Sequence, residues 1–161
     1  MPYFSSDILF VKHFKGIIAT ANIRGGGLAI SGTSNGGLLV AVCAQQRPDL
    51  FGAVVGDVGL YDMLRYHKFT LASSWIGEYG NPDDAKDFKY IYKYSPLHNL
   101  RYPLSGQWPS TLIMTGDHDD RVVPSHTLKY AATLYEMVKG HPEQMNPLLF
   151  RIEKNVGHTG G

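Results

Sequence analysis

The sequence is poor in several features that mark particular classes of protein. It contains a single cysteine, Cys43, which excludes an internal disulfide and a cysteine-based structural zinc site. Its 15 Lys and Arg residues balance 14 Asp and Glu residues, and no basic run occurs. This balance argues against a nucleic-acid-binding protein that works by neutralising phosphates. No apolar run reaches the roughly 18 residues of a membrane span. We therefore expect a protein that binds neither nucleic acid nor a membrane.

Other familiar patterns are missing as well. The N-terminus, MPYFSSDILF, lacks the basic and apolar regions of a secretory signal, so we expect a soluble intracellular protein. No H-E-x-x-H, EF-hand or paired-cysteine pattern is present, and neither is a glycine-rich dinucleotide or phosphate-binding motif. We expect no metal and no cofactor.

What is present is a chain of 161 residues with 43% hydrophobic residues, enough for one domain with a buried core. Short apolar runs alternate with longer helical patterns, which is typical of an α/β fold with a mainly parallel sheet. The expected strands are 16–23, 28–31, 53–58, 111–115 and 148–152, and the expected helices are 37–46 and 124–139. Residues 61–110 are aromatic and rich in turn formers.

One junction does not fit this pattern. The run NIRGGGLAI, residues 22–30, joins two expected strands through only a few residues, three of them glycine. Parallel neighbours need a crossover of about a dozen residues, usually with a helix. Either the two strands form a hairpin or a segment between them is missing.

The strongest chemical motif is Gly32-Thr33-Ser34-Asn35-Gly36, a G-x-S-x-G sequence between an expected strand and an expected helix. This context is that of a nucleophile elbow, a sharp turn that exposes a serine hydroxyl at a helix N-terminus. Small residues on both sides let the strand and the helix pack closely. The Asn35 N–H would then face a developing oxyanion. The alternative is a glycine- and serine-rich loop.

A serine nucleophile needs an acid and a base, which follow it in that order in this fold. Asp117, Asp119 and Asp120 follow the expected strand 111–115, and their spacing does not choose among them. Each could instead cap the next helix. Of the seven histidines, His158 alone follows the last expected strand, so we expect it to be the general base.

With these motifs in view, the chain resembles the catalytic domain of the prolyl oligopeptidase family, cytoplasmic serine peptidases. The matching stretches are FVKHFKGIIATANIRGGG, GTSNGGLLVAVCAQQRPDLFGAVVGDVG, YKYSPLHNL and TGDHDDRVVPSHTLKYAATL. An asparagine directly after the nucleophile favours this family over its dipeptidyl-peptidase and acylaminoacyl-peptidase relatives.

The resemblance implies an α/β-hydrolase fold with helices on both faces of the sheet, and a role for each site residue. Ser34 would be the nucleophile, Asp119 the acid, His158 the base and Asn35 an oxyanion donor. The residues that would bind the substrate are Trp75, which would stack on its proline ring, Arg121, which would hold a carbonyl, and Tyr79, Val122 and Leu60, which would line the same pocket. Without the resemblance, Trp75 would be read as a core aromatic. The implied reaction is cleavage of short peptides after proline.

The chain departs from the family in three places. Family members have a few dozen further residues between the NIRGGG loop and the nucleophile strand, and a closing helix after the histidine. Upstream they have a β-propeller and further strands, which include a tyrosine that completes the oxyanion hole. We therefore expect residues 1–161 to form a partial hydrolase domain without a propeller.

The alternatives to a peptidase are a small-ester esterase and a non-catalytic product that binds a partner through an exposed sheet face. The sequence predicts no oligomeric state.

Overall fold

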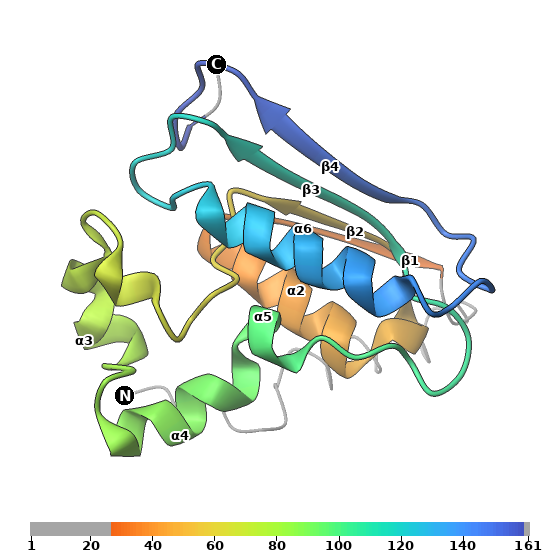
Figure 1. The fold of residues 1–161 in the computed structure, drawn as a ribbon, viewed down its shortest axis with the longest axis horizontal. Coiled ribbons are helices and arrows are strands. Elements are labelled where there is room, and N and C mark those ends of the chain that lie inside the picture. Colours follow the sequence, from red (N-terminus) through yellow and green to blue (C-terminus); the bar gives the residue numbers. More distant parts are fainter. Residues whose placement is uncertain (1–26, 160–161) are drawn as a thin grey trace.

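The structure is a computed structural model that describes residues 27–159 (Figure 1). Its four strands are β1 (Leu28–Thr33), β2 (Phe51–Asp57), β3 (Ser110–Gly116) and β4 (Leu148–Glu153). Its α-helices are α2 (Asn35–Gln46), α3 (Ile76–Tyr79), α4 (Ala85–Tyr94), α5 (Pro96–Asn99) and α6 (Ser125–Val138). Three short 3₁₀ helices cover Pro48–Leu50, Tyr66–Lys68 and Ala72–Trp75.

The strands form one parallel sheet in the order β1-β2-β3-β4. Each connection between neighbours contains a helix, as parallel pairing requires. The expected α/β fold is therefore confirmed, and each expected strand and helix that falls on described residues is found within two residues of its predicted bounds. Because all strands run the same way, the chain segments that follow Thr33, Asp57, Gly116 and Glu153 emerge at one edge of the sheet.

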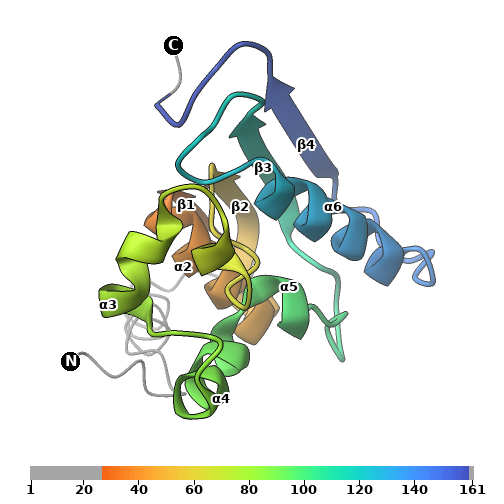
Figure 2. The same ribbon diagram turned by 60° about the vertical axis from the view of Figure 1, so that its left-hand side comes forward.

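The core lies between the sheet and the helices. Helix α2 packs on β1 and β2, and seven of its twelve residues are buried, because it is covered by the sheet on one side and by α5 on another. Helix α6 follows β3 and lies beside α2 on the same face of the sheet (Figures 1 and 2). This shared layer brings the start of α6 close to the segment that follows β2.

Residues 61–110 contain more helix than their composition suggested. The Asp84 side chain accepts hydrogen bonds from the Lys86 and Asp87 N–H groups and so caps α4 at its start. Pro96 follows the end of α4 and begins α5. Only Ile91 of α4 is buried, whereas Phe88, Tyr90 and Tyr92 are exposed.

The expected strand 16–23 and most of the 22–30 junction lie outside the described residues. From Leu28 onward the chain forms β1, which pairs with β2. Among residues 27–159, no helix is both long and apolar enough to cross a membrane.

Candidate active site

Ser34 occupies a sharp turn between β1 and α2. Its backbone has φ 58° and ψ −117°, a conformation that non-glycine residues rarely adopt, and its N–H donates to the Asp57 carbonyl at 2.8 Å. The turn is tight enough that a Cβ atom on Gly32 would lie 2.1 Å from the Gly36 carbonyl oxygen. Glycine at position 32 is what allows the strand and the helix to approach, as expected of a nucleophile elbow.

His158 lies between Ser34 and Asp119. Its Nε2 is 3.0 Å from Ser34 Oγ, and its Nδ1 is 2.8 Å from Asp119 Oδ2. The Asp119 side chain is fully buried and that of His158 is 10% exposed, so both are shielded from water. The three side chains come from the ends of β1, β3 and β4, which the parallel sheet places at one edge. This geometry permits proton transfer from the serine hydroxyl to the imidazole.

The loop after β3 distinguishes the three aspartates that the spacing left open. Asp119 contacts His158, and its second oxygen, Oδ1, accepts the N–H groups of Arg121 and Val122 at 3.0 and 2.9 Å. Asp117 instead contacts His118 at 2.6 Å, and this hydrogen bond lowers the pKa of its carboxyl group. Asp120 is exposed. Of the three aspartates, Asp119 is thus the one whose carboxylate contacts the His158 imidazole.

Close packing holds the acid loop and the histidine loop together. The Asp117 N–H donates to the Glu153 carbonyl at 3.0 Å, and the His118 N–H donates to the Val156 carbonyl at 3.0 Å. A Cβ atom on Gly116 would lie 2.2 Å from that same Val156 oxygen. A side chain at position 116 would therefore push the His158 loop away from the end of β3.

Four of the five residues expected to bind substrate belong to the hydrophobic core or pack against it. Leu60, Tyr79 and Val122 are buried members of the hydrophobic core cluster, and Trp75 packs against it half-buried. The Tyr79 hydroxyl donates to Asn35 Oδ1 at 3.0 Å, which joins this region to the first residue of α2. Arg121 is exposed, and it touches the candidate triad through its backbone N–H.

Asp57 is a site residue that the sequence reasoning missed. It ends β2, its carbonyl accepts the Ser34 N–H, and it lines a cavity of about 280 Å³ that also borders His158. Burial raises the pKa of its carboxyl group, and the nearby His158 opposes that shift. Its place at the carboxyl end of a buried strand was a usable signal, because ligand-binding residues gather there in parallel sheets.

The candidate site does not resemble a metal centre. Within residues 27–159, no group of three or more His, Cys, Asp or Glu side chains is arranged to hold a metal ion.

Comparison with known proteins gives a consistent family. The model of the prolyl oligopeptidase family matches residues 10–161. Prolyl oligopeptidase A of Amanita bisporigera is 40% identical over 99% of this chain, and prolyl endopeptidase of Dictyostelium discoideum is 40% identical over 96%. This chain spans only 26% and 25% of those two relatives. The alignment with the Amanita protein extends over 201 positions, about 40 more than the 161 residues here, so that relative has additional residues within the aligned region.

Solved structures give the same result. Prolyl oligopeptidase B from Galerina marginata, as a serine-to-alanine mutant bound to a 35-residue hydrolysis and macrocyclization substrate, superposes with a TM-score of 0.83. It is 41% identical, and the match covers 92% of this chain and 20% of that one. Histidine-to-alanine and aspartate-to-alanine mutants of the same protein, also bound to substrates, match with TM-scores of 0.82. The chain belongs to the prolyl oligopeptidase family.

Proposed function

We propose that this chain is a serine peptidase that cleaves short peptides on the carboxyl side of proline. The observation that carries the proposal is the continuous set of hydrogen bonds from Ser34 Oγ through the imidazole of His158 to Asp119. The relatives' names, which include prolyl oligopeptidases and prolyl endopeptidases, support the choice of reaction and of substrate class.

In the proposed reaction, Ser34 Oγ forms a bond to the carbonyl carbon while His158 Nε2 takes the hydroxyl proton. Asp119 stabilises the resulting imidazolium through Nδ1. The imidazolium then gives its proton to the leaving amine, the C–N bond breaks, and an acyl-enzyme remains. Water, deprotonated by His158, attacks the acyl carbon and releases Ser34.

The start of α2 is suited to stabilise the oxyanion that forms in each step. Asn35 is the first residue of the helix, so its N–H has no acceptor within the helix. The positive end of the helix dipole adds to the attraction for negative charge. In the proposed complex the proline ring of the substrate packs on the half-buried Trp75, and the carbonyl oxygen accepts the Asn35 N–H.

A fluorophosphonate probe tests the nucleophile independently of substrate choice. We expect labelling of the wild-type chain and none of Ser34→Ala, because the probe phosphonylates only an activated serine, with fluoride as the leaving group. His158→Gln should slow labelling by about three orders of magnitude or more. The control is Ser73→Ala, which removes an exposed serine hydroxyl elsewhere. If the wild-type chain is not labelled, the alternative of a non-catalytic product that binds a partner remains.

Substrate preference is tested with a proline amide and a small ester that carry the same fluorescent leaving group. We expect kcat/KM for the amide to fall at least about tenfold when the proline is replaced by alanine, because the pocket would lose ring contacts. Ester hydrolysis without amide hydrolysis would favour the esterase alternative.

A further inference from the structure

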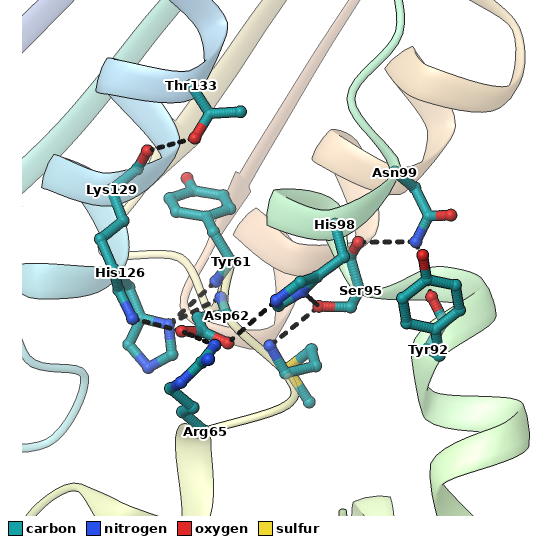
Figure 3. A network of polar contacts seen from close by, with 11 residues as sticks. Tyr61, Asp62, Arg65, Tyr92, Ser95, His98, Asn99, His126, Lys129 and Thr133 are labelled. Carbon is teal, nitrogen blue, oxygen red and sulfur yellow. Dashed lines mark hydrogen bonds and ion pairs between the residues drawn. The ribbon is translucent and has the colours of Figure 1, made fainter.

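A buried polar cluster lies between α6 and the segment that follows β2 (Figure 3). His126, in the first turn of α6, is only 2% exposed. Its Nδ1 accepts hydrogen bonds from two consecutive backbone N–H groups, those of Tyr61 at 3.2 Å and Asp62 at 2.9 Å. An accepting Nδ1 has a free lone pair, so the ring is neutral and carries its proton on Nε2.

A second link lies one turn further along α6. Lys129 forms an ion pair and hydrogen bond with Asp62, whose side chain is fully buried. Arg65 and His98 lie 3.6 and 3.9 Å from the same carboxylate. The side chains of α6 therefore hold residues 61 and 62 through both their backbone and a side chain.

These links join the two segments that carry Leu60 and Val122, which are expected to line the pocket for proline. Leu60 directly precedes Tyr61, and Val122 lies four residues before His126. The segment from Asp119 to Val122 is also fixed, because Asp119 Oδ1 accepts a hydrogen bond from the Val122 N–H. A short path of hydrogen bonds thus runs from Asp119 to Val122, and from His126 to the residue beside Leu60.

Packing alone does not account for a histidine at this position. An apolar side chain would fill the space without the cost of burying an imidazole, but it would leave the two N–H groups of Tyr61 and Asp62 without an acceptor. What histidine supplies is one acceptor at a fixed place on a rigid ring, which sets the distance between the two segments.

We propose that His126, assisted by the Lys129–Asp62 pair, is a positioning residue that sets the spacing between Leu60 and Val122 and thereby the preference for proline. This inference rests on the proposed function. Because His126 is buried, it acts through the two backbone segments that it joins.

The test compares His126→Asn with His126→Gln in the full chain. Asn places its Oδ1 where the histidine Nδ1 lies, whereas Gln places its amide one bond further out. The readout is the ratio of kcat/KM for a proline amide to that for the matching alanine amide, which does not depend on the fraction of folded enzyme. We expect Asn to keep the ratio within about twofold, and Gln to lower it about tenfold because the pocket walls shift.

Lys129→Met provides a second variant, because the Lys129 side chain is 38% exposed and its loss is easier to accommodate. We expect it to lower the same ratio about threefold. If His126→Gln does not fold, an unchanged ratio in Lys129→Met still overturns the proposal. A ratio that Gln leaves unchanged, or that Asn lowers as much as Gln, overturns it as well.

Amide hydrogen exchange separates this inference from the function on which it rests. The Tyr61 and Asp62 amides should be protected in the wild type and in His126→Asn, and exchange at least about tenfold faster in His126→Gln. A wild-type chain without proline preference but with this exchange pattern overturns the proposed function and the selectivity role together, and leaves the link itself established. Fast exchange of both amides in the wild type overturns the link.

Discussion

Asn35 is held by its side chain as well as by its place in α2. The Tyr79 hydroxyl donates to Asn35 Oδ1 at 3.0 Å, and Tyr79 is itself fixed by an edge-to-face contact with Tyr66, with ring centroids 5.4 Å apart. Tyr79 was expected to line the proline pocket through its ring. Its hydroxyl adds a second connection, to the residue whose N–H would stabilise the oxyanion.

Replacing Tyr79 with Phe should separate these two contributions. We expect kcat for a proline amide to fall about fivefold, because one hydrogen bond to Asn35 is lost, while KM changes less than about twofold because the ring remains. Steady-state kinetics measure both values. Tyr66→Phe is the matched control, since its hydroxyl donates to the Gly80 carbonyl and not to Asn35. An equal fall of kcat in the two variants would contradict a specific role for the Tyr79 hydroxyl.

For single residues, the sequence predicted which residues form the candidate site better than it predicted their contacts. Ser34 followed from a motif with a required turn, and His158 followed from chain order. Spacing did not choose among Asp117, Asp119 and Asp120, because their contacts depend on the shape of a loop, and Asp119 was expected only from the family resemblance. Asp57 was missed because its contact with Ser34 is made by a backbone carbonyl, which every residue has.

Among the secondary-structure elements, α2 is the most enclosed, and it contains the only cysteine of the chain. Cys43 is 1% exposed, and burial raises the pKa of its thiol to about 11. The raised pKa lowers the fraction of reactive thiolate, and the low exposure blocks the access of alkylating agents to it.

Cys43 therefore reports on the opening of α2. At about pH 8 we expect iodoacetamide to modify native protein at least about a hundredfold more slowly than unfolded protein, because thiolate is scarce and access is blocked. Mass spectrometry over time measures both rates, and Cys43→Ala gives the background. Native and unfolded rates within about threefold of each other would mean that α2 is not stably packed on β1 and β2.

The strands of the sheet were predictable from the sequence because their burial is regular. The helices within residues 61–110 were not. Each strand is a short apolar run with turn formers on both sides, and α2 is apolar all round because the sheet and α5 enclose it. Helix α4 exposes Phe88, Tyr90 and Tyr92, so its pattern of apolar residues does not mark a buried face. Its start depends on the Asp84 cap, a local signal that many loops share.

For the molecule as a whole, the parallel sheet follows from the alternation of strands and helices along the chain, whereas the polar cluster around Asp62 follows from tertiary packing alone. His126, Asp62 and His98 come from three segments that are distant in sequence, and no motif links them. This cluster is also the main reason to expect the stability of the fold to depend on pH.

Burial lowers the pKa of His126 to about 4 from 6.5, against the attraction of Asp62 and with the help of Lys129. Burial likewise lowers the pKa of His98, against the same carboxylate and with the help of Arg65 and Lys129. The folded chain thus binds fewer protons than the unfolded chain between about pH 6.5 and 4. The free energy of unfolding should be highest above pH 6.5 and fall as the pH drops through this window, with His126 accounting for about 3 kcal/mol. The Asp62 carboxyl group, whose pKa Lys129 lowers against the opposing effect of burial, adds its own loss only at lower pH.

Urea unfolding at several pH values between about 7.5 and 4.5, followed by circular dichroism, measures this dependence. His126→Asn keeps an acceptor for the Tyr61 and Asp62 N–H groups but does not titrate, so its stability should fall less steeply over the same window. The difference between the two curves isolates the imidazole from His98 and from the surface carboxylates, which both proteins share. Parallel curves would mean that His126 takes up its proton without leaving the cluster, and the neutral ring would then not be what holds α6 to the segment after β2.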